Sequence, residues 1–417
     1  MLGRRQIILI GIAVLVIGGI VLLFLFGRQK PSGDVSGNLL FWGTFDSPSI
    51  IGSLVTEYKK SRPKVEVRYR QANPTTYESE LVNALAGANP PDLFMVHNTW
   101  MPEHFDKIAP FDSRLIPFSS FRDLFPQIVE RDFSSEGVIY ALPLYIDTLA
   151  MFYNRDLLDQ KGVATIPKTW EDFEKEVPKL RVLDRQGRIQ KPAAAIGGSN
   201  KSINRATDIL NLVFLQAGTK MVAEDFSRAT FNSNEGLAAF NYYIKFGNPL
   251  SPSFTWQDSL TYSLDSFAAG DTAIMFNYSH QIPFLKEKNP FLNFRVAPML
   301  QPAQRSEDIN FANYWGVAVS GKTPQREAAQ DFIRFLTTDP VGSQKYLAAT
   351  GKPPALRSLI SKYSSDPEIG VFTKQILTAR SWPEIDGSAV ENTLSGMIES
   401  VLAGRAPANR ALREAED

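Results

Sequence analysis

Residues 7–26 form an unbroken, uncharged and strongly apolar run, with Arg4 and Arg5 before it and Arg28 and Lys30 after it. An apolar helix of about 20 residues can cross the roughly 30 Å hydrocarbon core of a bilayer. A secretory signal peptide has a shorter apolar region than this run and ends in a small-residue cleavage site. No good site of that kind follows Phe26. We therefore expect a retained membrane anchor at 1–30, a linker at 31–37 and an extracytoplasmic remainder.

Length and composition limit the classes of protein that the remainder can be. A chain of 417 residues is too long for one core, and 44% hydrophobic with 21% charged residues is ordinary globular composition. Lys+Arg and Asp+Glu balance at 44 each, so no overall charge indicates a nucleic-acid partner. The chain has no cysteine and only 3 histidines. We therefore expect no disulfide, no zinc–thiolate or histidine-rich metal site and no cofactor. A carboxylate site for calcium stays open, although the sequence has no EF-hand-like spacing.

Strands and helices alternate along the soluble part. Residues 38–45 and 64–70 have strand patterns, the segment between them has helical spacing, and 77–96 gives a helix, a Gly/Pro break and a buried strand. This order is typical of an α/β domain with a mainly parallel sheet. The pattern recurs after Tyr145, and the chain is mostly helical from Gln325 onward. No repeat of solenoid length is visible.

Two motif-based interpretations, a phosphate-binding loop and a catalytic triad, do not fit the surrounding sequence. GVAVSGKT (316–323) has the spacing of a phosphate-binding loop, but its interior has a strand pattern, and Pro324 removes an amide where the helix should begin. A strand, a turn and a helix starting at Pro324 fit better. No histidine lies in a nucleophile elbow. Paired carboxylates of a glycosidase remain open among Asp46, Asp92, Asp147 and Asp265.

Aromatic residues lie at or near the ends of several predicted strands. They are Trp42, Trp100, Tyr145, Tyr278 and Trp315. Open α/β sheets bind ligands outside the carboxyl ends of their strands. Rings with polar neighbours suit a sugar, because the rings stack on its apolar face while amides and carboxylates bind its hydroxyls.

Six ordered segments resemble the extracellular solute-binding protein family 1 of ABC importers, the sugar-binding proteins related to maltose-binding protein. The most specific is GVIYALPLYIDTLAMFYNRDLLDQKGV (137–163) followed by IPKTWEDFEKEVPKL (166–180). The others are NLLFWGTF (38–45), YESELVNALAGANPPDLFMVHNTWMPEHFDKIAPFD (77–112), FAAGDTAIMFNYSHQ (267–281), YWGVAVSGKT (314–323) with EAAQDFIRFLTTDPVGSQKYLAATGKPPALRS (327–358), and VLAGRAPANRALREA (401–415). The resemblance covers nearly all of 38–417.

The resemblance implies an α/β, two-lobe periplasmic-binding-protein type II fold with a hinge and an interlobe cleft. Lobe 1 would comprise 38–145 plus about 282–323, and lobe 2 would comprise 146–281 plus about 324–417. The crossing segments would lie near 143–150, 277–283 and 323–329.

By position in the family, the resemblance implies ligand-binding roles for residues at the strand ends and crossings. These are Thr44, Phe45, Asp46, Asn98, Trp100, Tyr145, Asp147, Tyr278, His280, Gln281, Trp315 and Trp382. His280 occupies a position where the family often has tryptophan. The lipid-anchored cysteine of many relatives is absent, and the apolar N-terminal segment would replace it.

The resulting prediction is a membrane-tethered, non-enzymatic binding protein. It would hold a mono- or oligosaccharide in the cleft and deliver it to ABC permease subunits. Three alternatives stay open at this point: the same fold with a non-sugar polar solute, a carbohydrate-active enzyme, and a cleft-based sensor.

Overall fold

The first lobe is built on a six-stranded sheet with the order β2-β1-β3-β15-β4, in which β7 also pairs with β15. The computed structural model describes residues 35–417. The strands are β1 (Gly37–Gly43), β2 (Val65–Gln71), β3 (Leu93–His97), β4 (Ile108–Ala109), β7 (Ala141–Pro143) and β15 (Trp315–Ser320). β1 is parallel to β2 and β3, whereas β15 is antiparallel to β3. The predicted parallel α/β unit over 38–96 is therefore confirmed.

Local sequence signals explain where the helices of this lobe begin. α2 (Pro48–Lys59) starts after Ser47, whose hydroxyl accepts a hydrogen bond from the Ile50 amide, and proline occupies its first turn. α3 (Tyr77–Ala86) connects β2 to β3. α13 (Arg326–Thr337) packs Phe332 against Tyr58 of α2, with ring centroids 4.9 Å apart. α14 (Pro340–Thr350) ends at Gly351, which has a φ of 65°.

The segment with phosphate-loop spacing is a strand of this sheet. Residues 316–320 lie inside β15, fully buried, and a turn separates β15 from α13. The helix begins at Arg326, two residues later than expected. Gly316 is required here because an added Cβ would lie 2.7 Å from the Leu142 carbonyl oxygen of neighbouring β7. The strand interpretation of this motif is confirmed.

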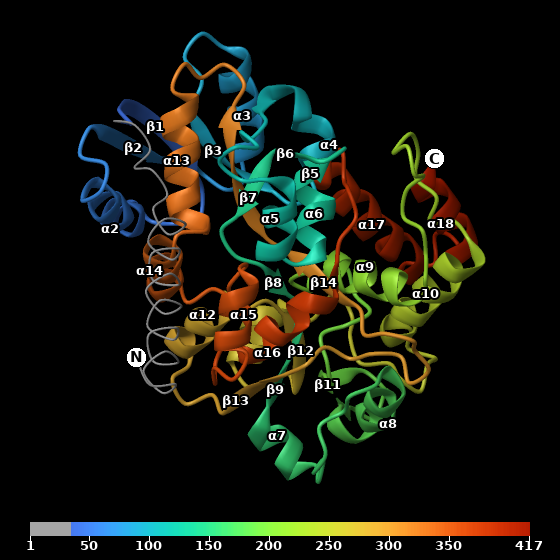
Figure 1. Ribbon diagram of the computed structural model, residues 1–417. Coiled ribbons are helices and arrows are strands. Elements are labelled where there is room, and N and C mark those ends of the chain that lie inside the picture. Colours follow the sequence, from blue (N-terminus) through green and yellow to red (C-terminus); the bar gives the residue numbers. More distant parts are fainter. Residues whose placement is uncertain (1–34) are drawn as a thin grey trace, which may run out of the picture.

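The second lobe has a three-stranded antiparallel sheet surrounded by helices (Figure 1). Its strand order is β12 (Ile274–Asn277), β9 (Ala150–Asn154) and β13 (Phe294–Ala297). The helices are α7 (Arg155–Gln160), α8 (Trp170–Leu180), α9 (Ala206–Gln216), α10 (Asn234–Ile244), α11 (Ser263–Ala268), α12 (Gln281–Lys288), α17 (Gly387–Leu402) and α18 (Ala408–Glu416).

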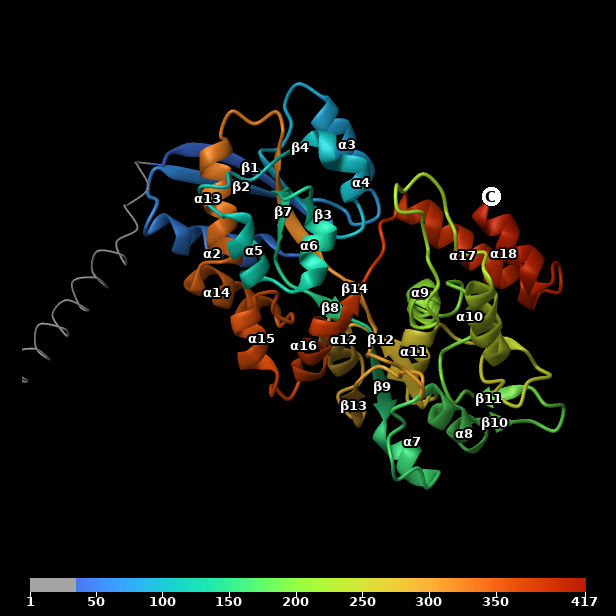
Figure 2. The same cartoon turned by 45° about the vertical axis from the view of Figure 1, so that its right-hand side comes forward.

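A small sheet of crossing strands lies between the lobes (Figure 2). β14 (Asn310–Asn313) is antiparallel to β8 (Asp147–Thr148) and parallel to β16 (Ala379–Arg380). The side-chain amide of Gln375 donates to the Thr148 hydroxyl and the Leu149 carbonyl, each at 2.9 Å. Three passages of the chain are thus hydrogen-bonded together where the lobes meet, as a hinge between two lobes requires.

The two cores divide the chain at other points than those predicted. The first crossing, at β8, falls within the expected 143–150. The second crossing is made by β14 and the third leads to β16. Neither lies in the expected ranges, which were 277–283 and 323–329. β13 pairs with β9, which keeps 281–297 in the second lobe. Helices α13 and α14 pack in the core of the first lobe and not in that of the second.

Shorter elements complete the described part of the chain. They are α4 (Met101–His104), α5 (Phe118–Leu124), α6 (Gln127–Phe133), β5 (Ser134–Ser135), β6 (Val138–Ile139), β10 (Val182–Leu183), β11 (Ile189–Lys191), α15 (Arg357–Tyr363), α16 (Gly370–Gln375) and the 3₁₀ turns at Phe105–Lys107, Lys245–Gly247 and Ile376–Thr378. Among residues 35–417, no helix has the length and apolarity needed to cross a bilayer. The predicted anchor lies outside the described residues.

Candidate functional site

A cavity of about 670 Å³ opens between the lobes, next to the crossing strands. The first lobe contributes the ends of β1, β3 and β15 with parts of α3 and α4, and the second contributes the first turns of α9 and α17. Asn313 of the crossing strand β14 also lines the cavity. A volume of this size accommodates a small solute or a short oligosaccharide.

The wall from the first lobe is aromatic. Trp315 begins β15, and its ring lies 5.0 Å from that of Trp100 and 5.4 Å from that of Phe45. Phe45 is 51% exposed and lines the cavity. These residues meet because the carboxyl ends of β1 and β3 and the amino end of antiparallel β15 share one edge of the sheet.

A neutral histidine lies beside the aromatic wall. His97 ends β3, and its ring centroid is 5.2 Å from that of Trp315. Burial lowers the pKa of His97 to about 4, against an opposing hydrogen bond with Asn313. The neutral ring donates through Nε2 to Asn313 Oδ1 at 3.2 Å and accepts at Nδ1 from the Thr99 hydroxyl at 2.9 Å. It therefore contributes hydrogen bonding and no charge.

The wall from the second lobe is charged. Arg205 precedes α9 with a left-handed backbone (φ 68°), and its Nη1 lies 3.9 Å from Asp208 Oδ2. Tyr278 donates its hydroxyl to the same Asp208 oxygen at 2.7 Å. Arg205 Nε and Asn211 Oδ1 are buried without a hydrogen-bond partner. Both residues line the cavity, so this wall includes hydrogen-bonding atoms that the fold does not satisfy.

Several carboxylates at this wall have raised pKa values. Burial, reinforced by repulsion from Asp208 and Glu391, raises the pKa of Glu384 to about 8. Burial also raises the pKa of Asp208, against the attraction of Arg205 and the hydrogen bond from Tyr278. At neutral pH, Glu384 is thus largely protonated and can donate a hydrogen bond as well as accept one.

Three of the twelve predicted ligand-binding residues line the cavity: Phe45, Trp100 and Trp315. The other nine do not line it. They are Thr44, Asp46, Asn98, Tyr145, Asp147, Tyr278, His280, Gln281 and Trp382.

Most of these nine are held by the fold. Asp46 binds Lys352 Nζ at 2.8 Å, Asn98 donates to Asp132 at 3.0 Å, and Asp147 accepts from Ser279. Tyr145 lies under the Lys352 ammonium, which is 4.3 Å from its ring centroid. Trp382 is buried, and His280 has a half-exposed side chain outside the cavity.

Sequence reasoning missed the polar half of the cavity: His97, Arg205, Asp208, Asn211, Glu384 and Glu391. Arg205 and Asp208 lie at the start of α9, and nothing in the sequence of this helix shows that its first turn faces the cleft. Glu384 and Glu391 reach the cleft only because α17 returns to the second lobe after α13 to α16, and no local pattern encodes that return.

Two lobes, a hinge of crossing strands and a cleft with aromatic and polar walls define a solute-binding protein. The chain belongs to the bacterial extracellular solute-binding proteins, whose family profile matches residues 53–371. The resemblance drawn from the sequence is confirmed, and the family is one of binding proteins and not of enzymes.

Individual relatives agree with this assignment. The maltotriose-binding protein of Pyrococcus abyssi is 23% identical over 88% of this chain and 78% of its own length. The sugar-binding protein MalE of Xanthomonas citri superimposes with a TM-score of 0.77 at 20% identity, covering 91% of this chain and 95% of that one. UgpB of Mycobacterium tuberculosis, solved with glycerophosphocholine, gives 0.73 at 18% identity, covering 91% and 96%. The structural neighbours share the two-lobe fold.

Proposed function

We propose that this protein binds an oligosaccharide or a smaller sugar in the interlobe cleft and delivers it to the permease of an ABC importer. The observation that carries the proposal is the aromatic wall of Phe45, Trp100 and Trp315 opposite Arg205 and its neighbouring carboxylates. A sugar matches this pairing, since its ring faces are apolar and its edges carry hydroxyls. Sugar binding by relatives such as the maltotriose-binding protein supports the same class.

A glycan panel tests this proposal. The full-length protein, purified in detergent, is screened by thermal shift against maltooligosaccharides and other glycans, and any hit is measured by titration calorimetry. We expect at least one glycan to raise the melting temperature and to bind with one-to-one stoichiometry. Absence of any binding across a broad panel would contradict the sugar assignment.

Substitution of Phe45 tests the site directly, because this side chain is exposed and is not part of the hydrophobic core. Phe45→Ala should weaken glycan binding by at least about tenfold, or ~1.4 kcal/mol, through loss of a stacking surface. Phe291→Ala is the matched control, since Phe291 is 93% exposed and does not line the cavity. Equal affinity of both variants would remove Phe45 from the site.

A second candidate is a polar solute with an anionic group. Arg205 offers a guanidinium with an unpaired Nε at the cleft, and guanidinium groups bind phosphate well. The fold neighbour UgpB was solved with such a compound. Mass spectrometry of small molecules that co-purify with the native protein separates the two candidates: a glycan supports the first, and a phosphodiester supports the second.

We also propose that residues 7–26 anchor the protein in the membrane, because the apolar run is long enough to span it. An anchored binder stays concentrated near a membrane permease. After an alkaline wash, full-length protein should remain with the membranes, whereas a chain lacking residues 1–34 should be released. Release of both forms would contradict the anchor.

A further inference from the structure

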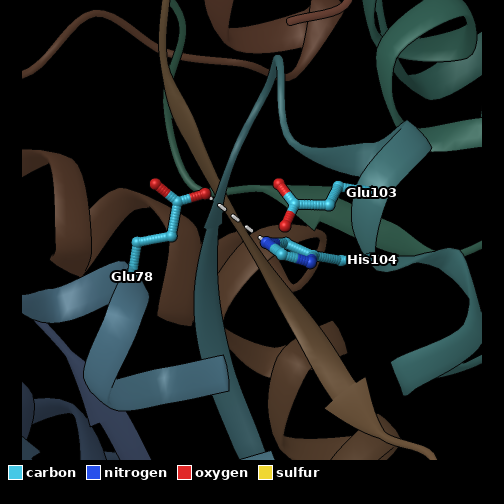
Figure 3. A group of neighbouring side chains, drawn as sticks. All are labelled: Glu78, Glu103 and His104. Atoms are coloured by element: carbon cyan, nitrogen blue, oxygen red, sulfur yellow. Dashed lines mark ion pairs between the residues drawn. The ribbon is translucent and has the colours of Figure 1, made fainter. Parts of the chain in front are cut away.

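Three side chains that can bind a metal converge on the first lobe (Figure 3). Glu78 comes from α3, whereas Glu103 and His104 come from α4. One donor atom from each lies within 4.8 Å of the others. No other such group occurs among residues 35–417.

The histidine of this cluster is buried without a hydrogen bond. The side chain of His104 is 1% exposed, and neither of its ring nitrogens has a hydrogen-bond partner. Oε1 of Glu78 is also buried without one, and it lies 3.5 Å from His104 Nε2. Leaving such groups unpaired costs free energy, roughly 1–3 kcal/mol for each. Something that binds both nitrogen and oxygen donors would remove this cost.

We propose that Glu78, Glu103 and His104 bind a divalent transition-metal ion, with zinc as the best match. One imidazole nitrogen and carboxylate oxygens are ordinary zinc ligands, whereas calcium and magnesium take oxygen ligands. Two carboxylates also neutralise the charge of a divalent ion.

The distances are compatible with this assignment. Zinc lies roughly 2.0–2.2 Å from nitrogen and oxygen donors, so the ligand atoms of a tetrahedral site are about 3.3–3.6 Å apart. Glu78 Oε1 and His104 Nε2 already lie 3.5 Å apart. Glu103 is exposed, so its carboxylate is free to move toward these two atoms.

The position of the cluster connects the ion to the cleft. Glu78 and Glu103 both line the cavity. Three protein ligands leave one tetrahedral position, which a water molecule or a solute oxygen can fill. The ring of His104 also meets the Trp100 ring edge to face, with centroids 5.9 Å apart. A bound metal would fix the imidazole that packs against Trp100 of the aromatic wall.

Titration of the metal itself tests the proposal. Full-length protein without an affinity tag is treated with a chelator, dialysed and titrated calorimetrically with zinc chloride, with calcium and magnesium chloride as comparisons. We expect one zinc per chain and much weaker binding of calcium and magnesium. Cobalt(II), bound in place of zinc, should give the visible absorption of a tetrahedral site. Failure to bind one equivalent of zinc overturns the proposal.

Variants locate the ion. Glu78→Gln and Glu103→Gln should each weaken zinc binding by at least about tenfold. Glu103→His, which supplies another zinc donor, should retain most of the affinity. The control is Glu80→Gln, on the same helix as Glu78 but paired with Arg70 at 2.7 Å. Because Glu103 is exposed, its variants should fold. Equal zinc affinity in the two Gln variants and the control would place the ion elsewhere and refute the site.

Discussion

The carboxylate of Asp147 accepts two hydrogen bonds from Ser279, one from the hydroxyl at 2.7 Å and one from the amide at 3.0 Å. Its other oxygen accepts from the Thr148 amide at 2.9 Å. Asp147 begins the crossing strand β8, whereas Ser279 follows β12 in the second lobe. The pair therefore joins the hinge to the second lobe and uses most of the hydrogen-bonding capacity of the Asp147 carboxylate within the fold.

Asp147→Ala should destabilise the protein without removing the binding site. Three donors lose their acceptor in a buried position, which should lower the free energy of unfolding by about 3 kcal/mol. Chemical denaturation measures the loss, and Asp159→Ala, at an exposed pair with Arg155, should change it by less than about 0.5 kcal/mol. An unchanged stability in Asp147→Ala would contradict the structural role.

Lys352→Met should destabilise the first lobe. Lys352 binds Asp46 at 2.8 Å, and both side chains are largely buried. Methionine keeps the apolar stem but leaves Asp46 with only the Tyr346 hydroxyl at 3.0 Å, a loss of about 3 kcal/mol. Lys362→Met, at an exposed lysine bound to Gln344, is the control and should have little effect. Equal stability of the two variants, measured by denaturation, would refute the assignment.

Local signals in the sequence were sufficient for the first α/β unit and for part of the aromatic wall, but not for the division of the chain between the two lobes. Alternating strands and helices predicted β1 to β3, and aromatic residues at strand ends predicted the wall of Trp100 and Trp315. Both signals are local, since periodicity and the positions of strand ends can be read directly from the chain.

The polar residues of the cleft could not be predicted, because they come together from segments far apart in the sequence and no local pattern indicates which segments meet. The period of two in a strand indicates that Tyr145 and Asp147 share a side, but not whether this side faces the cleft or the hinge. The left-handed backbone of Arg205 has no signature, because such a conformation usually selects glycine or asparagine.

The raised pKa of Glu384 predicts a pH-dependent stability. Between its ordinary value of 4.5 and its folded value of about 8, the unfolded chain has lost the proton that the folded protein keeps. The folded state then binds more protons, so stability falls as pH rises through this range. Glu384→Gln should flatten this fall and melt higher than wild type at pH 9.

Melting temperatures of both proteins from pH 4 to 9 measure the effect. Glu414→Gln, at an exposed carboxylate of α18, is the control and should follow wild type. Parallel profiles for Glu384→Gln and wild type would mean that Glu384 titrates near its ordinary value and is ionised in the cleft at neutral pH.

Arg205→Gly should weaken solute binding and also cost stability. Glycine adopts the φ of 68° without strain, but the change adds entropy to the unfolded chain and leaves buried Asp208 without its neighbouring cation, so the free energy of unfolding should fall by about 1–3 kcal/mol. Solute affinity should fall at least about tenfold, because the cation of the polar wall is lost. Glu136→Gly is the matched control: it has a φ of 51°, is exposed and does not line the cavity. It should leave solute affinity unchanged in calorimetry. Retained affinity in Arg205→Gly would show that the left-handed arginine serves the fold and not the solute.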